Sequence, residues 1–503
     1  MRFLTVLAGL LSTCSILCAA ESNDTSSSVS RLVLPKDFKP PQVFKNVNLV
    51  RNTNLEKGYV RETINVVVEN TDKQPQSDYY LAFPSDVIGK IGGLEVRNKK
   101  APEKGRFQVE ATQLESSSDS QFYKIHFPEP LASSSQLTLG ISYYILSALD
   151  PLPKAINQGD MQYLTYTFSA YVPSAYPTDS QKTKIKFPNT NVPDYTTTSG
   201  LKSGSDPETQ GASYTYGPYN KVPAGATYPI TVRFEATKPI LASSLLERDL
   251  EVSHWGGNLA TEERYWLRND GAKLANHFDR VDWTLKTYTN MPTSALRELK
   301  YPLKPGSVDP YFTDDIGNVS TSRYRPGNKG REAHLELKPR YPVFGGWKYS
   351  FRVGWNNELS SFLRKSAEGT DSYVLKVPFL EGPKNPEGIQ YEKVVVRVIL
   401  PEGATNVRYE IVEGATSNGL PDPSQIVANI SKHRTFMDTV GRTALSLSVD
   451  NLSDEARDSQ LVVIYDYPFT AGLRKPLTIA AGLLAVFVTV WVIGNLDVSI
   501  KKR

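Results

Sequence analysis

Histidines and carboxylates are the residues of this chain most able to do chemistry, and they are sparsely placed. Acidic pairs occur at Asp279/Asp282 and at Asp314/Asp315. No Asp-x-Asp is present to hold the metal ion of a sugar-nucleotide transferase, and turn or helix-capping roles are favoured for both pairs. None of the histidines has a partner at the spacing of a local metal motif, so we interpret them as structural or solvent-exposed. The five are His126, His254, His277, His334 and His433.

Signatures of nucleophilic and nucleotide-dependent catalysis are missing. The Gly-x-Ser-x-Gly turn that exposes a catalytic serine does not occur, and neither do the glycine-rich loops that bind dinucleotides or phosphates. Lys and Arg number 57 against 53 Asp and Glu, and the formal charge of +4 is spread over the chain, which argues against a nucleic-acid partner. We therefore expect neither an active site nor a cofactor in this chain.

The recurring chemical motif is the tripeptide Asn-x-Ser/Thr. In a secreted chain it is an acceptor for N-linked glycans, provided that the middle residue is not proline and the asparagine lies at the surface. All four copies in the chain meet the first condition. The predicted glycosylation sites are Asn23, Asn318, Asn429 and Asn451.

The N-terminus predicts the compartment. Residues 3–17 carry no charge and are followed by small residues at the positions that signal peptidase reads, which is typical of a secretory signal peptide, residues 1–20. The only two cysteines, Cys14 and Cys18, lie within it. The mature chain is therefore expected to hold no thiol, which excludes disulfide scaffolds and cysteine-ligated metal sites.

The C-terminus predicts a membrane anchor. Residues 477–496 are uncharged, and at 1.5 Å per residue a helix of this length spans roughly 30 Å, the thickness of a hydrocarbon core. With a signal peptide at the other end, the expected topology is single-pass type I, with a short cytosolic tail, residues 497–503. A removable signal for a lipid anchor is the alternative, which basic residues after the apolar segment disfavour.

Alternation of apolar and polar residues dominates the region between the ends. Leu164, Tyr166 and Phe168 share one face of a predicted strand, with threonines on the other. Amphipathic helices are few, and the best candidates are short pieces around residues 294–299 and 358–365. The fold class is therefore expected to be mainly β, with antiparallel, sandwich-like domains.

Two β-rich lumenal domains are predicted, residues 21–238 and residues 239–472. The chain is long enough for each to bury its own core. Short blocks of the first domain also resemble blocks of the second, because in each of them apolar residues precede a proline. This similarity indicates a duplicated β unit. The blocks are residues 170–173 and 186–189, with 375–378 and 399–402 as their counterparts.

Tryptophan is concentrated in the middle of the chain. Tryptophan rings can stack on sugars or peptides, but they also serve as core anchors in a β domain without disulfides, and the core role is favoured. Five of the six tryptophans lie there, namely Trp255, Trp266, Trp283, Trp347 and Trp355.

The same stretch carries a resemblance to a known family. In one order along the chain it contains SHWGGN, YWLRNDGAKL, FDRVD, DIGNVSTS and PRYPVFGGWK, and these blocks resemble ribophorin I. They begin at residues 253, 265, 278, 315 and 339. The signal peptide, the β-rich body and the single C-terminal span agree with that family over nearly the whole chain, and the short tail resembles its fungal members.

The resemblance implies a function without an active site. Ribophorin I is a non-catalytic subunit of the oligosaccharyltransferase complex of the endoplasmic reticulum membrane, which transfers a dolichol-linked oligosaccharide to Asn-x-Ser/Thr of nascent proteins. The implied partners are a catalytic multispanning subunit, the other subunits of the complex, the nascent polypeptide and the translocon. Asn318 lies in a family block with its tripeptide intact. The alternatives are an independent type I receptor for glycans or peptides, and a lumenal hydrolase.

Overall fold

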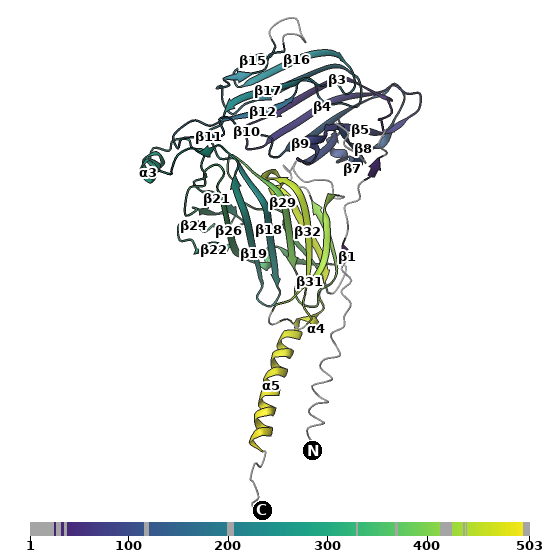
Figure 1. Cartoon of the computed structure of the whole chain (residues 1–503). Helices are drawn as coiled ribbons and strands as arrows, with labels where there is room; N and C mark the ends of the chain where they lie inside the picture. The colour runs from purple at the N-terminus through teal and green to yellow at the C-terminus, as the bar shows by residue number, and fades with distance from the viewer. Residues whose placement is uncertain are drawn as a thin grey trace, which may run out of the picture.

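The computed structural model of the chain describes residues 25–26, 32–34, 38–114, 120–198, 206–327, 330–367, 371–412, 425–435, 438 and 440–495. The fold is mainly β, as the sequence predicts. Figure 1 shows two β-rich domains stacked one on the other, with a long helix leaving the far end of the second. The predicted signal peptide, residues 1–20, and the predicted tail, residues 497–503, lie outside the described residues.

The first domain contains a seven-stranded sheet and two four-stranded sheets. In spatial order the large sheet consists of β15 (Glu208–Gln210), β16 (Ser213–Val222), β13 (Thr178–Lys186), β3 (Phe44–Asn54), β4 (Val60–Asn70), β9 (Gln136–Ile145) and β6 (Ile91–Asn98). One smaller sheet consists of β10 (Asp150–Pro151), β12 (Tyr163–Ser169), β17 (Pro229–Glu235) and β14 (Asp194–Tyr195). The other consists of β2 (Leu32–Leu34), β7 (Gln108–Leu114), β8 (Ser120–Leu131) and β5 (Gln76–Pro84), which leads into the short helix α2 (Ser85–Ile88).

The second domain is built around a nine-stranded sheet. In spatial order its strands are β1 (Thr25–Ser26), β31 (Val427–His433), β32 (Arg442–Ser453), β29 (Ile389–Ile399), β18 (Leu241–Ser253), β19 (Asn258–Asn269), β26 (Lys348–Glu358), β22 (Val308–Asp314) and β23 (Gly317–Asn318). A four-stranded sheet contains β27 (Leu363–Lys365), β28 (Ser372–Pro378), β33 (Gln460–Asp466) and β30 (Thr405–Val412). A three-stranded sheet contains β21 (Leu299–Leu303), β25 (Ala333–Leu337) and β24 (Arg323–Arg325).

The two domains share one strand order. Each large sheet contains three antiparallel strands, β3-β4-β9 in the first domain and β18-β19-β26 in the second. The first strand of each set also pairs in parallel with a further strand, β3 with β13 and β18 with β29. That further strand pairs antiparallel with the next one, β13 with β16 and β29 with β32. The four-stranded sheets β10-β12-β17-β14 and β27-β28-β33-β30 match strand for strand. The sheets are therefore mixed rather than purely antiparallel, and the chain is a tandem repeat of one β unit.

Only one of the two sequence echoes lies at equivalent places in this repeat. Residues 186–189 begin where β13 ends, and residues 399–402 begin where β29 ends. Residues 170–173 follow the end of β12, however, whereas residues 375–378 close β28. The similarity between residues 170–173 and 375–378 is therefore out of register with the repeat, because a strand followed by proline recurs by chance in β proteins.

Alternating burial explains the strands. Along β4 every second residue is buried, and β19 shows the same period, so each strand presents one mainly apolar face to its core. One apolar core is built from residues between Phe44 and Ile240, and the other from residues between Leu241 and Ala471. The predicted boundary after residue 238 stays a prediction about where independent folding units meet.

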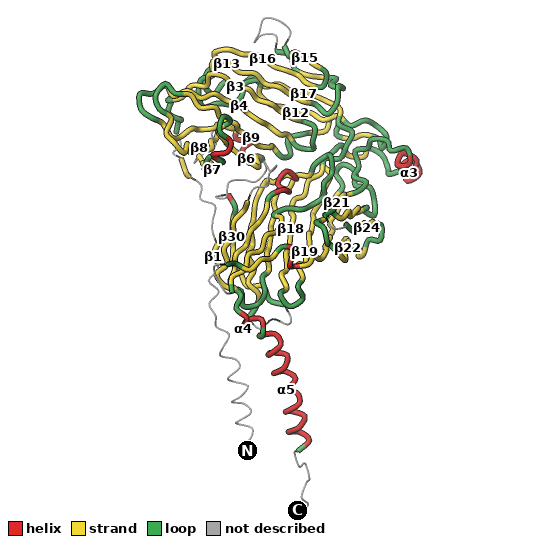
Figure 2. The backbone as a smooth tube through the Cα atoms, turned by 180° about the vertical axis from the view of Figure 1, so that it is seen from behind, coloured by secondary structure: helices red, strands yellow, loops and turns green. Residues whose placement is uncertain are grey.

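The domains are joined by many contacts as well as by the chain. The amide of Gly58 donates to the carbonyl of Glu387 at 2.8 Å, and the amide of Ser147 donates to Oε1 of Gln390, also at 2.8 Å. A parallel bridge pairs β11 (Ala155–Ile156) of the first domain with β20 (Lys273–Leu274) of the second. Seen from behind in Figure 2, helix α3 (Arg280–Tyr288) projects from the region where the two bodies meet.

The helices differ from the sequence-based expectation. Residues 294–299 form no helix, since Leu296 instead makes a β-bridge with Val343, and residues 358–365 contain only a single turn, Leu359–Ser361. Conversely, α3 (Arg280–Tyr288) is a helix that the sequence analysis did not predict, and none of its residues is buried. The C-terminal helix α5 (Arg474–Gly494) begins before the predicted residue 477, because Pro476 is tolerated in a first turn.

Candidate functional site

One residue of each acidic pair caps backbone amides, as predicted. Asp279 is the N-cap of α3, and its carboxylate accepts from the amides of Val281 (2.8 Å) and Asp282 (3.2 Å). Asp314 closes the β22–β23 hairpin by accepting from the amide of Ile316 at 3.0 Å and from Nε of Arg340 at 2.5 Å. Burial raises the pKa of Asp314, but these donors outweigh it and hold the pKa below its usual range.

The histidines are dispersed. His126 contacts Asp78 (2.9 Å) and Glu110 (3.3 Å) on the sheet of β5 and β8, whereas His254 lies in the second domain, 2.7 Å from the hydroxyl of Tyr465. His277, His334 and His433 are exposed. In the described part of the chain, no three His, Cys, Asp or Glu side chains are grouped as metal ligands.

Two of the predicted glycosylation sites differ in exposure. Asn318 is exposed at the end of the β22–β23 hairpin, and its carbonyl accepts from Nη2 of Arg340 at 2.9 Å, so the acceptor tripeptide is presented on a fixed turn. Asn429 is half-buried in β31 between β1 and β32. Its neighbours Ala428 and Ile430 pack on the core, so its side chain lies on the opposite face of the sheet.

Asn451 lies in the contact between the domains. Its amide nitrogen donates to the carbonyls of Gly89 (2.9 Å) and Ile91 (3.3 Å) in the first domain. Ser453, the hydroxyl residue of this tripeptide, is completely buried. Asn23 lies outside the described residues.

The tryptophans form no single binding platform. Trp355 is buried in the second core, and Trp266 stacks with Arg264, whose guanidinium carbon is 4.5 Å from the ring centroid. Trp283 of α3 and Trp347 both pack on Phe344. The fifth, Trp255, is 72% exposed in the β18–β19 turn, and its Nε1 donates to the carbonyl of Gly472 at 2.9 Å.

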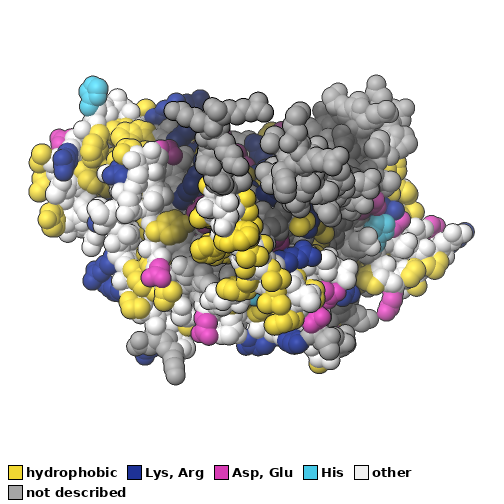
Figure 3. All heavy atoms as spheres, turned by 90° about the horizontal axis from the view of Figure 1, so that it is seen from below, with side chains coloured by type: hydrophobic (Ala, Val, Ile, Leu, Met, Phe, Trp, Pro, Cys, Tyr) yellow, Lys and Arg dark blue, Asp and Glu magenta, His cyan; other side chains and the backbone are white. Residues whose placement is uncertain are grey.

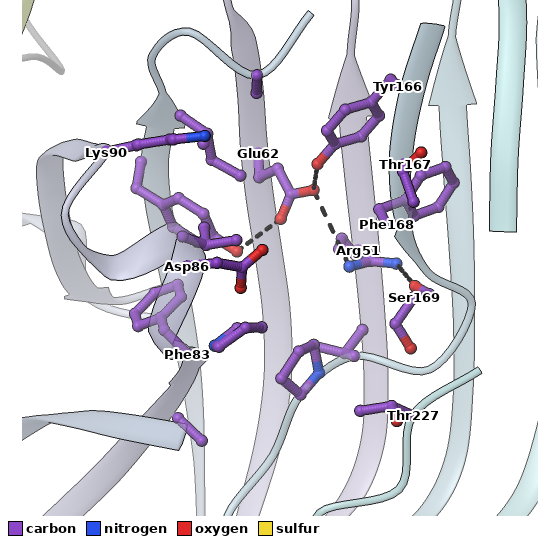
Figure 4. Close-up of a pocket in the computed structure, with 18 of the residues that line it drawn as sticks. Arg51, Glu62, Phe83, Asp86, Lys90, Tyr166, Thr167, Phe168, Ser169 and Thr227 are labelled. Carbon is purple, nitrogen blue, oxygen red and sulfur yellow. Dashed lines mark hydrogen bonds and ion pairs between the residues drawn. The ribbon is translucent and has the colours of Figure 1, made fainter. Parts of the chain in front are cut away.

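A cavity of about 260 Å³ in the first domain is a site that sequence patterns did not reveal. Figure 4 shows Arg51 and Glu62 side by side at its centre, with Phe83, Asp86 and Lys90 on one side and Phe168 and Thr227 on the other. The strands β3, β4, β5, β9 and β12 supply its walls. Exposed residues such as Asp86, Lys90 and Thr227 are part of its lining, so it opens to solvent.

A buried charged network lies at the centre of this cavity. The carboxylate of Glu62 accepts from the hydroxyls of Tyr143 (2.6 Å) and Tyr166 (3.3 Å), and Arg51 Nη1 lies 3.9 Å from it. Burial, together with the charge of Glu62, raises the pKa of both tyrosines well above the usual value, so their hydroxyls stay protonated donors. Arg51 also donates to the carbonyl of Ser169 and lies over the ring of Phe168.

The end of the second domain leads into an apolar helix. Among the described residues, α5 is the one helix long and apolar enough to cross a membrane, and none of its residues is buried in the protein. Figure 3, seen from this end, shows hydrophobic side chains clustered on the helix, with Lys and Arg side chains at the surrounding surface. This confirms the expected apolar C-terminal helix.

The sequence matches a known family model along most of its length. The model of ribophorin I aligns with residues 44–494, which include both β domains and α5. The chain belongs to the ribophorin I family.

Relatives in that family come from animals, fungi and plants. Dolichyl-diphosphooligosaccharide–protein glycosyltransferase subunit 1 of Caenorhabditis elegans is 29% identical over 91% of this chain and 73% of its own length. The protein of the same name from Schizosaccharomyces pombe is 29% identical over 86% of this chain and 90% of its own length. Subunit 1B of Arabidopsis thaliana is 28% identical over 96% of this chain and all of its own length.

Two solved structures that match this chain resemble it only slightly. A leukotriene A4 hydrolase from Saccharomyces cerevisiae has a TM-score of 0.26 at 14% identity, over 38% of this chain and 29% of its own. A zinc metallopeptidase from Deinococcus radiodurans has a TM-score of 0.24 at 11% identity, over 44% of this chain and 42% of its own. Likenesses of this size carry no argument about fold or activity.

Proposed function

We propose that this chain is a non-catalytic subunit of a dolichyl-diphosphooligosaccharide–protein glycosyltransferase. It acts in the endoplasmic reticulum as a single-pass type I protein, with both β domains in the lumen and α5 in the membrane. The match to the ribophorin I family over residues 44–494 supports this proposal, as do relatives named as subunit 1 of that transferase. Its partners are then the catalytic multispanning subunit and the other subunits of the complex.

The observation that carries the proposal is the way the domains are fixed to each other and to the span. Contacts from Gly58, Ser147 and Asn451 tie the first domain to the second, and the Trp255–Gly472 hydrogen bond ties the second to the start of α5. A body held in this way above a single helix is suited to positioning. Its role is to hold polypeptide and partner subunits at set places over the membrane.

Exposed apolar residues provide surfaces for those partners. Helix α3 projects from the domain junction (Figure 1), and its side chains Val281, Leu285 and Tyr288 are exposed on one side. Exposed apolar faces of this kind are typical of protein contacts. The lipid-facing surface of α5 offers a second contact, where Gly482 allows a partner helix to approach closely.

The cavity of the first domain is placed to receive acceptor polypeptide. Among the described strands β5 pairs with one neighbour, β8, and on its other edge the amide of Tyr80 donates to the hydroxyl of Tyr176 at 3.2 Å, whereas residues 81–84 pair with no further strand. Residues 81–84 of β5 line the cavity beside Phe168 of β12. An extended segment of nascent chain can pair with such an edge while its side chains enter the cavity.

The test is exchange of the span in the full-length tagged chain. Residues 477–494 are replaced by an unrelated apolar helix of equal length, and a chain with the native span serves as the control. We expect less co-purification of the multispanning subunit from mild detergent with the exchanged span. Equal recovery contradicts a specific helix contact. A chain that purifies alone in both forms favours an independent receptor instead.

A further inference from the structure

The tandem repeat places residues of the two domains in corresponding positions. Arg51 on β3 pairs in register with Thr183 of the parallel strand β13, and Arg248 on β18 pairs in the same way with Val396 of β29. Each guanidinium donates to the backbone carbonyl of the last residue of a strand in the four-stranded sheet of its domain. Arg51 donates to Ser169 at the end of β12, and Arg248 donates to Pro378 at the end of β28. Arg51 and Arg248 are therefore equivalent residues of the repeated unit.

In the second domain this arginine has two carboxylate partners. Nη1 of Arg248 lies 2.5 Å from Oε1 of Glu263, the residue directly across from it on β19. Nη2 lies 2.7 Å from Oε2 of Glu381, which follows Pro378 by three positions. All three side chains are buried, so one arginine is held between two acids.

In the first domain both of those carboxylates are replaced by apolar residues. Ile64 is the residue directly across from Arg51 on β4, and Val172 follows Ser169 by three positions, as Glu381 follows Pro378. The alignment extends into this loop, since the amides of Ala170 and Phe379 donate to corresponding carbonyls, those of Tyr228 and Ser459.

The space near Arg51 is open where its counterpart is filled. Ile64 and Val172 both line the 260 Å³ cavity. Arg51 is only 3% exposed, and its remaining acid, Glu62, lies diagonally across the strand pair at 3.9 Å. Within the described residues Nε has no hydrogen-bond partner in either arginine, so the two sites differ in their carboxylates and not at this atom.

We propose that the cavity of the first domain binds a carboxylate group, which pairs with Arg51 in the place that Glu381 takes beside Arg248. The bound state then has one arginine and two acids, as the second domain has. The other charged groups of the lining are Lys90, Asp86 and Asp150, which are exposed and so screened by solvent. The volume and the aromatic walls suit an acidic side chain of a polypeptide, and this inference rests on the proposed function, in which the same cavity receives acceptor polypeptide.

Calorimetry on the full-length chain in detergent tests the ligand chemistry. The probes are the blocked peptides acetyl-Ala-Glu-Ala-amide and acetyl-Ala-Gln-Ala-amide, with sodium acetate as competitor. We expect the glutamate peptide to bind at least about ten-fold more tightly than the glutamine peptide, because an ion pair with a buried guanidinium is lost in the latter. Equal binding of the two peptides overturns the proposal.

Acetate distinguishes two sources of the carboxylate. If acetate displaces the glutamate peptide, a small free carboxylate is a sufficient ligand. If it does not, the site requires the peptide around the carboxylate. Either result retains the carboxylate as the group that Arg51 binds.

The substitution Val172→Glu tests the location, with Val172→Gln as the matched control. Glutamate at this position supplies the acid that Glu381 supplies in the second domain, so we expect V172E to raise the melting temperature relative to V172Q and to abolish peptide binding. This design leaves Arg51 in place, because its removal would leave the buried carboxylate of Glu62 without its cation. A V172E chain that melts no higher than V172Q and still binds the peptide overturns the proposal.

Discussion

The hydroxyl of Tyr59 in the first domain donates to Oδ1 of Asp454 in the second at 2.6 Å. Tyr59 is completely buried, and Nζ of Lys57 lies 3.0 Å from the same carboxylate. Burial, with Asp454 and Glu455 nearby, raises the pKa of Tyr59 well above its usual value, so the donor keeps its proton throughout the neutral range. The domains are thus held together by buried polar contacts with fixed geometry, which suits a positioning role.

Glycine at position 92 is required for the approach of the domains. A Cβ built there overlaps the carbonyl oxygen of Asn451, whereas at Gly89 a Cβ meets nothing within 4 Å. We expect Gly92→Ala to lower the free energy of unfolding by about 1–3 kcal/mol, the usual cost of overpacking, and Gly89→Ala to change it little. Thermal melting and limited proteolysis at the junction measure this. Equal melting of the two variants contradicts the contact.

Glycan occupancy should differ between Asn318 and Asn451. Asn318 is exposed on a hairpin, whereas Asn451 donates across the junction and its Ser453 is buried, so a glycan at Asn451 does not fit the folded molecule. We expect Asn318→Gln to remove one endoglycosidase-sensitive mass increment and Asn451→Gln to remove none. Intact-mass analysis of the two variants decides, and a glycan on Asn451 rules out this packing of the two domains.

Removal of Arg248 should be costly. It leaves the carboxylates of Glu263 and Glu381 buried without their cation, a change that typically costs about 3–5 kcal/mol. We expect R248M to unfold at much lower denaturant concentration, and the triple variant R248M/E263Q/E381Q to recover part of the loss. If R248M alone matches the native chain, the buried network does not stabilise the second domain.

Acid should destabilise the second domain partly through His254. Burial lowers the pKa of His254, so below about pH 6.5, where an unfolded histidine gains a proton, the unfolded chain binds more protons than the folded one. This contribution to stability is complete above that pH and is lost as pH falls through it. We expect the melting temperature of the native chain to fall more than that of His254→Gln between pH 7.5 and 5.5. Parallel decreases would show that His254 does not contribute.

The sequence predicted the features that depend on local pattern. The alternation at Leu164 and Tyr166 and the apolar run of α5 were confirmed, because period and length are set by residues close in the chain. The mixed sheets were missed, since the parallel pairing of β3 with β13 joins segments separated by several intervening strands. Helix α3 was missed because many of its residues are β-branched or aromatic and favour strands, namely Val281, Trp283, Thr284, Thr287 and Tyr288.

The cavity could not be predicted for a related reason. Arg51, Glu62 and Phe168 come from three strands, and no spacing in the sequence marks them as neighbours. The equivalence of Val172 with Glu381 became visible only through strand order and register. Sequence comparison of the halves alone aligns residues 170–173 with 375–378, which is out of register with the repeat.

The most direct test of the scaffold role is isolation of the full-length tagged chain from membranes in mild detergent, followed by an assay of oligosaccharide transfer to an Asn-x-Thr acceptor peptide. We predict recovery of a multispanning subunit together with transferase activity, and loss of both when that subunit is depleted. A chain recovered alone, without activity, contradicts the account.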